Sequence, residues 1–102
     1  MSRLKSRVAL VSGSAQGIGK GIARALARAG AMVALWDINY LVHETSKDIN
    51  RLGGKAFSYV VNVTDPYQVK DAAEQIENKL GKIVYLRVLR TFYKKEAQIC
   101  LY

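Results

Sequence analysis

The sequence predicts an α/β fold of three layers, in which a parallel sheet built in the order β-α-β-α-β-α is covered by helices on both faces. Three observations predict it. Short apolar runs alternate with longer segments whose apolar residues recur at helical spacing, and glycines stand at most of the junctions. The length of 102 residues suits one small domain. Such a rhythm implies right-handed crossovers between parallel strands.

The first unit is a strand followed by a helix. Val8–Val11 is a continuous apolar run, as expected of a strand buried on both faces of a parallel sheet. Gly17–Ala29 is rich in helix formers with apolar residues at helical intervals, and Gly30 stands where a helix cap belongs. We therefore predict the first strand and the first helix at these positions.

The second unit repeats this arrangement. Met32–Trp36 is the next apolar run and ends at the acidic Asp37. A segment from about Leu41 to Leu52 has helical spacing, and Gly53-Gly54 stops it. These features predict a second strand and a second helix.

The third unit begins with the strand-like Ala56–Val61. Thr64 or Asp65 can cap the next helix, and Pro66 suits its first turn. A further strand is expected from Ile83 to about Leu89. The apolar face of the third helix is expected to consist of Val69, Ala72, Ala73, Ile76 and Leu80.

Half of the net charge of +8 lies in the last 21 residues of the chain. Residues 1–81 hold 11 basic and 7 acidic side chains, whereas residues 82–102 hold 5 basic and 1 acidic. This distribution favours a solvated basic surface or tail over a nucleic-acid site, which would cluster cations on the domain itself. We therefore divide the chain into a domain over 1–89 and a basic tail over 90–102 without firm secondary structure, and predict no nucleic-acid partner.

Cysteine usage and hydropathy bear on location. Cys100 is the one cysteine, so neither an internal disulfide nor a cysteine metal site is expected, and the composition suits a reducing compartment. No apolar run approaches the roughly 18 residues of a membrane span, and the first residues lack a secretion signal. The expectation is a cytoplasmic protein with no membrane span and no metal.

A glycine-rich segment, residues 12–19, lies between the first predicted strand and helix. Gly13 can form the sharp turn, Gly17 lets the backbone approach a pyrophosphate, and Gly19 allows the helix to pack closely on the sheet. The helix would present free N–H groups to phosphate oxygens. An ordinary tight turn is the alternative. The cofactor-binding residues predicted here are Gly13, Ser14, Gln16, Gly17, Ile18 and Gly19.

Asp37 supports the dinucleotide interpretation. It ends the second predicted strand, where a carboxylate can accept hydrogen bonds from both hydroxyls of the adenosine ribose. It would also repel a 2′-phosphate, and neither Gln16 nor Ile38 supplies a cation for one. We therefore predict NAD rather than NADP, with Asp37 and Ile38 beside the adenosine. The alternative for Asp37 is a helix cap or a solvated acid.

The pattern Gly13-x-x-x-Gly17-x-Gly19 resembles that of the short-chain dehydrogenase/reductase family, and Asn62-Val63-Thr64-Asp65 is similar to the family's Asp-Val-Thr-Asp segment. The resemblance implies a Rossmann-like fold, NAD(P)-dependent hydride transfer between alcohols and carbonyls, and contact of Asn62 and the Val63 amide with adenine. Asn62 replaces the family's usual Asp, and its amide oxygen can still accept from the adenine amino group.

The resemblance covers about residues 6 to 84 and stops before the family's catalytic Ser, Tyr and Lys. In the family the Lys stands four residues after the Tyr, and no tyrosine of this chain has a lysine at that spacing. We therefore expect a truncated, inactive cofactor-binding portion with no catalytic residues, whose open sheet edge could allow self-association. The alternative is a non-enzymatic nucleotide-binding or interaction module.

Overall fold

The computed structural model describes residues 5–88 and 99–101, with the backbone alone for 85–88 and 99–101. Its five strands form one parallel sheet in the order β3-β2-β1-β4-β5. The central strand β1 (Val8–Ser12) lies between β2 (Met32–Asp37) and β4 (Ile83–Val88), while β3 (Lys55–Val60) and β5 (Ile99–Leu101) are the edge strands.

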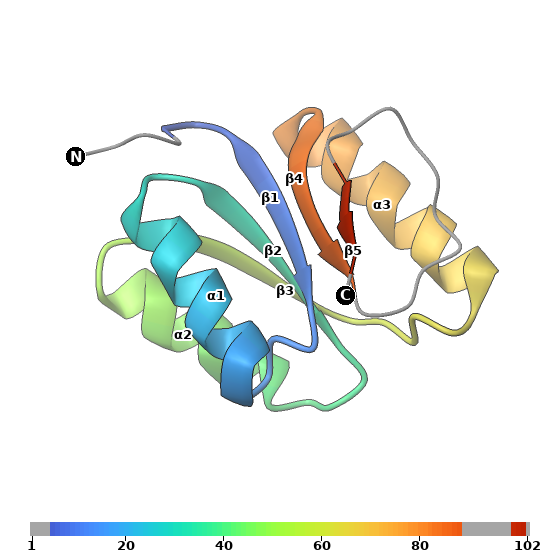
Figure 1. Cartoon of the computed structure of the whole chain (residues 1–102), viewed down its shortest axis with the longest axis horizontal. Helices are drawn as coiled ribbons and strands as arrows, with labels where there is room; N and C mark the ends of the chain where they lie inside the picture. Colours follow the sequence, from blue (N-terminus) through green and yellow to red (C-terminus); the bar gives the residue numbers. More distant parts are fainter. Residues whose placement is uncertain (1–4, 89–98, 102) are drawn as a thin grey trace.

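Helices cover both faces of this sheet (Figure 1). α1 (Gly17–Arg28) and α2 (Val42–Arg51) lie on one face, and α3 (Pro66–Leu80) lies on the other. The predicted three-layer βαβαβα order is therefore confirmed, and it is followed by β4 as expected. Because β1 is the central strand, its carboxyl end and the loop that leads into α1 lie between the carboxyl ends of the neighbouring parallel strands β2 and β4.

The alternation of side chains along β1 and β2 divides the core into two clusters. Val8 and Leu10 of β1 face α3, whereas the intervening Ala9 and Val11 face α1 and α2. Every residue of β1 is buried, so this strand has no solvent-facing side. The apolar run that predicted a doubly covered strand is explained by this arrangement.

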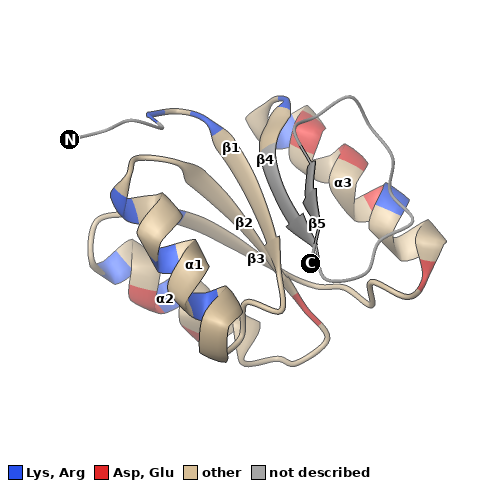
Figure 2. Cartoon of the chain, in the orientation of Figure 1, with Lys and Arg blue, Asp and Glu red and all other residues tan. Residues whose placement is uncertain are grey.

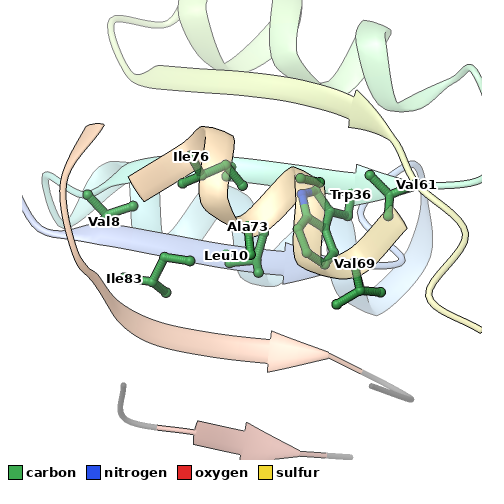
Figure 3. Packing of buried hydrophobic residues seen from close by; sticks show 10 residues of the cluster. Val8, Leu10, Trp36, Val61, Val69, Ala73, Ile76 and Ile83 are labelled. Atoms are coloured by element: carbon green, nitrogen blue, oxygen red, sulfur yellow. The ribbon is translucent and has the colours of Figure 1, made fainter. Parts of the chain in front are cut away.

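Trp36 is the largest fully buried side chain of the described residues, and it packs against α3 (Figure 3). Val61, Val69 and Ala73 belong to the same cluster. Within the described part of the chain, the indole Nε1 has no hydrogen-bond partner. Trp36 thus joins β2 to α3 through apolar contact alone, at the residue just before Asp37.

The start of α3 follows the capping chemistry that the sequence predicts. Asp65 is the N-cap, and its carboxylate accepts hydrogen bonds from the backbone N–H groups of Tyr67 and Gln68 at 3.0 and 3.4 Å. Pro66 occupies the first helical turn. Of the two alternatives, Asp65 rather than Thr64 is therefore the cap.

Element boundaries differ from the predicted ones by about a residue. β3 begins at Lys55 rather than Ala56 because Lys55 pairs in register with Met32, and it ends at Val60. α2 begins at Val42. Residues 99–101, within the segment that the sequence assigns to the tail, form β5 beside β4. Leu89, the predicted end of β4, lies outside the described residues.

Candidate functional site

The loop between β1 and α1 (residues 13–16), which we call the glycine loop, turns at Gly13 and again at Gly17, where α1 begins. Gly13 and Gly17 have φ values of 63° and 65°, in the left-handed region that glycine enters without steric cost. Gly13 turns the chain out of β1, and Gly17 starts α1. The loop therefore brings the first turn of α1 to the carboxyl edge of the sheet, beside the end of the central strand.

Gly19 explains how closely α1 approaches this loop. A Cβ atom at Gly19 would lie 2.0 Å from the carbonyl oxygen of Gly13 and 3.1 Å from that of Ser12. No side chain fits at such distances, so the backbone of the first turn lies directly against the loop backbone. The sequence predicted close packing at this glycine, and the structure supplies its steric reason.

The amino end of α1 is left open toward solvent. The N-cap residue Gln16 is extended and makes no side-chain cap, and the first turn contains no acidic residue. Gln16, Gly17 and Ile18 are exposed, Ile18 to 77%. The N–H groups of this turn and the positive end of the helix dipole are therefore available to an anion from outside the protein.

Ser14 differs from its exposed neighbours because it is buried. Its hydroxyl donates to the carbonyl oxygen of Trp36 at 3.1 Å, and its backbone N–H reaches the same oxygen at 3.2 Å. Two hydrogen bonds thus fasten the loop to the end of β2. Ser14 is placed to hold the loop in shape, with its side chain turned inward.

Asp37 connects the two loops that follow β1 and β2. One carboxylate oxygen accepts from the Ala15 N–H at 2.9 Å, and the other accepts from the Asn39 N–H at 2.9 Å. The side chain is half-buried. The N-cap position of α2 is Leu41, so Asp37 does not cap that helix. The structure therefore brings Asp37 and the glycine loop into direct contact.

A buried hydroxyl that sequence reasoning missed supports the same loop. Thr45 of α2 is fully buried, and its Oγ1 donates to the carbonyl oxygen of Ala15 at 3.3 Å. Ala15 is thus held at both its N–H, by Asp37, and its carbonyl, by Thr45. The only sequence signal for Thr45 was its position on the inward face of the second helix, which predicts packing rather than a polar contact.

Asn62 and Val63 follow β3, on the far side of β2 from the glycine loop. The Asn62 side-chain oxygen accepts from the N–H and the hydroxyl of Thr64 at 3.0 and 2.7 Å. These two bonds occupy both lone pairs of the amide oxygen. Among the described residues, no hydrogen bond joins Asn62 or Val63 to the glycine loop.

Among the described residues, neither His43 nor Tyr59 belongs to a second centre for proton transfer. His43 Nδ1 lies 2.7 Å from the hydroxyl of Ser58, which ties α2 to β3. Burial raises the pKa of Tyr59 above its ordinary value, the opposite of what a proton-transferring phenol needs. The described part of the chain has no cluster of metal-ligating side chains and no helix that is long and apolar enough to cross a membrane.

The sequence is similar to a known protein family and to characterised proteins. A family model described as short chain dehydrogenase matches residues 7–88. The 3-oxoacyl-acyl-carrier-protein reductase FabG of Thermotoga maritima is 39% identical over 82 residues, which are 79% of this chain and 33% of that protein. The 7alpha-hydroxysteroid dehydrogenase of Escherichia coli K12 is 37% identical, over 79% of this chain and 32% of its own length. The chain spans about a third of the length of these relatives.

Solved structures show the same likeness. A hydroxysteroid dehydrogenase from Escherichia coli superposes with a TM-score of 0.80 at 36% identity, covering 83% of this chain and 37% of that one. A protein described as a putative D-mannonate oxidoreductase from Haemophilus influenza, with bound NAD, gives a TM-score of 0.78 at 30% identity, covering 82% of this chain and 30% of that one. A metagenomic short-chain oxidoreductase in complex with NADP gives 0.79 at 28% identity, covering 82% and 38%.

Proposed function

The chain belongs to the short-chain dehydrogenase family, whose fold binds NAD(P), and we propose that it is the NAD(H)-binding portion of an oxidoreductase of this family. The observation that carries the proposal is the contact between Asp37 and Ala15, which joins a carboxylate to the loop before an uncapped helix. One end of this arrangement suits a diphosphate, and the other suits the hydroxyls of a ribose.

The residues present fit the diphosphate by three features. The amino end of α1 has no side-chain cap and no acid in its first turn. Gly17 has no Cβ atom, so phosphate oxygens can approach the backbone. The absence of a Cβ at Gly19 lets that turn lie against the loop. We therefore assign the pyrophosphate to the N–H groups of residues 17–19, with Gln16 and Ile18 at its rim.

Asp37 and its neighbours support NAD over NADP. Each Asp37 carboxylate oxygen accepts one backbone N–H and retains a lone pair for a ribose hydroxyl. A 2′-phosphate in the same place would meet a negative charge at close range. Gln16 and Ile38, which flank this position, are uncharged and exposed, so neither offsets that repulsion.

The adenine ring would lie beyond Asp37, beside the residues that follow β3. The backbone N–H of Val63 is the group we assign to it. Asn62 could contribute its amide oxygen if the bond from the Thr64 hydroxyl were given up, because that oxygen already accepts two hydrogen bonds. Ile38, 66% exposed after β2, would cover one face of the ring.

We further propose that this chain binds the cofactor without turnover. When bound, the nicotinamide supplies hydride chemistry, and the family's proton donor is a Tyr with a Lys four residues later. No tyrosine of the sequence has a lysine at that spacing. A raised pKa at Tyr59 also disfavours it as a substitute. The single cysteine, Cys100, supports a reducing compartment, and we propose the cytoplasm.

Cofactor binding can be tested through Trp36, the one tryptophan of the sequence. It is buried one residue before Asp37, so its emission should transfer to a bound reduced nicotinamide. Titration with NADH is expected to quench Trp36 with a dissociation constant of about a millimolar or below. The proposal would be contradicted if quenching did not saturate and the highest NADH concentration left the thermal stability of the chain unchanged.

Two single variants of Ile18 distinguish an effect on cofactor binding from an effect on protein stability. Ile18→Glu places a negative charge in the first turn of α1, where the helix dipole favours it but a diphosphate is repelled. NADH affinity should fall about tenfold or more while the melting temperature stays equal or rises. Ile18→Gln, which adds similar bulk without charge, should bind nearly as the parent chain does. Equal binding by both variants would place the diphosphate elsewhere.

A further inference from the structure

A second candidate binding site lies at the amino-terminal ends of strands β2 and β3, whereas the glycine loop follows the carboxyl end of β1. Two hollows of about 420 and 200 Å³ adjoin there and share Ala27, Gly53 and Gly54 among their lining residues. They lie where α1 and α2 end and where β2 and β3 begin. A ligand in this place would not overlap the proposed dinucleotide. We call the two hollows together the basic groove.

All charged side chains that line the basic groove are cations. Arg24 and Arg28 line the larger hollow, and Lys5 and Lys55 line the smaller one, and no aspartate or glutamate is among the described residues that line either. The ion pairs of the described residues involve Lys20, Lys47 and Arg51 as cations, and none involves these four. In Figure 2 the ribbon of α1 carries the blue of basic residues and none of the red of acidic ones. The groove therefore holds positive charge that the described residues do not neutralise.

Most carbonyls at the ends of the two helices have backbone partners and do not need these cations. The carbonyls of residues 25–27 in α1 accept from the N–H groups of residues 29–31, and those of residues 48–50 in α2 accept from the N–H groups of residues 52–54. Because these carbonyls already have partners, the arginines are not needed to satisfy them. Arg24 and Arg28, four residues apart, project from one face of α1 toward the same hollow.

The lining also contains apolar surface. Leu52 borders the larger hollow and is 73% exposed, and Ala27 and Ile49 lie beside it. A ligand that matched both features would carry a negative head and an apolar body. Two guanidinium groups one turn apart suit a doubly charged phosphate, since each can donate two parallel hydrogen bonds.

From these features we infer that the basic groove binds an organic phosphate, a phosphate monoester with a short apolar group. The phosphate lies against Arg24 and Arg28, and the apolar group lies over Leu52. Lys5 and Lys55 raise the local positive potential from the adjoining hollow. The inference is independent of cofactor binding, because the groove lies at the amino-terminal ends of the strands and the glycine loop lies at their carboxyl ends.

The test is a titration of the full chain, labelled with ¹⁵N, with octyl phosphate, followed through backbone amide signals. Octyl phosphate should shift the signals of Gly53 and Gly54, inorganic phosphate should shift them more weakly, and 1-octanol should leave them in place. The amides of residues 17–19 report separately on any phosphate at α1. Shifts confined to residues 17–19, or equal shifts with 1-octanol, would overturn the inference.

Variants identify the cations. The double substitution Arg24→Gln and Arg28→Gln should raise the dissociation constant for octyl phosphate about tenfold, because two charge-assisted contacts are lost. Lys70→Gln, at an exposed cation of α3 away from the groove, should leave it unchanged. Should the glutamine pair fail to fold, Arg24→Lys with Arg28→Lys keeps the charge and is expected to bind at an intermediate level. Unchanged affinity in the folded glutamine pair, or in the single variants Arg24→Gln and Arg28→Gln if the pair does not fold, would refute the inference.

Discussion

The backbone N–H of Ala15 donates a hydrogen bond of 2.9 Å to the carboxylate of Asp37, across 22 residues of sequence. This bond joins the loop after the central strand to the end of the neighbouring strand. It fixes the carboxylate before any ligand arrives, and the second carboxylate oxygen is fixed in the same way by Asn39. The acid proposed to recognise ribose is therefore held in place by the same loop that is proposed to receive the diphosphate.

Asp37→Asn should change cofactor preference more than it changes the fold. The amide removes the negative charge that disfavours a 2′-phosphate, and it replaces one acceptor oxygen with a donor that faces the N–H of Ala15 or of Asn39. NADH affinity is expected to fall about tenfold while NADPH affinity falls less or rises. Competition between the two cofactors, followed by Trp36 emission, measures the ratio. Glu74→Gln, an exposed acid on α3, is the control and should leave the ratio unchanged.

Gly19→Ala and Gly21→Ala should act in opposite directions although both place alanine in α1. At Gly19 the added Cβ would meet the Gly13 carbonyl oxygen, so helix and loop must separate, at a cost of about 1–3 kcal/mol in unfolding free energy. At Gly21 the Cβ meets nothing within 4 Å, and alanine should stabilise the helix by about 0.5–1 kcal/mol. Urea unfolding of the pair checks this. Equal stabilities would mean that α1 does not contact the loop as described.

Asp65→Ala should remove the cap of α3. The carboxylate accepts from two backbone N–H groups, and its other oxygen accepts from the Gln68 side chain at 3.2 Å. The expected loss is about 1 kcal/mol of unfolding free energy. Asp65→Asn retains an acceptor and should recover most of it. If alanine and asparagine were equally destabilising, the capping bonds would not be the cause.

Asn50→Ala should weaken the attachment of edge strand β3. The Asn50 amide exchanges two hydrogen bonds with the backbone of Ala56, at 2.8 and 3.0 Å, in the manner of a further strand. Ser46 also donates to the Ala56 carbonyl, so the N–H loses its partner while the carbonyl keeps one. The cost should be about 1–3 kcal/mol. Asn78→Ala, at an exposed position on α3, is the matched control.

The same substitution bears on self-association through the sheet edge, which stays a prediction. Asn50 occupies the N–H and carbonyl of Ala56 that another chain would need for pairing. Sedimentation of Asn50→Ala should therefore show more dimer than the parent chain at equal concentration. If the variant were destabilised yet monomeric at all concentrations, Asn50 would stabilise β3 without protecting the sheet edge from pairing, and the prediction would be wrong.

Local pattern predicted most of the fold because the responsible forces are local or periodic. Val8–Val11 is apolar at every position, and it forms a strand covered on both faces. Pro66 and Asp65 determine the start of α3 through neighbouring backbone groups. β5 could not be predicted, since its three residues gain their order by pairing with β4. No periodicity within residues 90–102 indicates that partner.

The sequence indicates the residues of the candidate site, whose role in binding stays a prediction, but it does not indicate the contacts between them. Glycine spacing and the place of Asp37 at the end of an apolar run can be recognised in the sequence alone. The hydrogen bonds from Ala15 to Asp37 and from Thr45 to Ala15 depend on how two loops and α2 meet in space. Ser14 was predicted among the cofactor-binding residues, and its burial against Trp36 depends equally on tertiary contact.

The close packing around Gly54 limits which amino acids the chain can carry at that position. Its missing Cβ would lie 2.6 Å from Ile49 Cγ2 and 3.2 Å from Ala27 Cβ, where α1 and α2 converge. Every other amino acid begins with that same carbon, and the branched Ile49 has little freedom to yield. A saturation library should therefore reject all replacements at position 54 alike, whatever their polarity, whereas the exposed neighbouring position 52 should tolerate many.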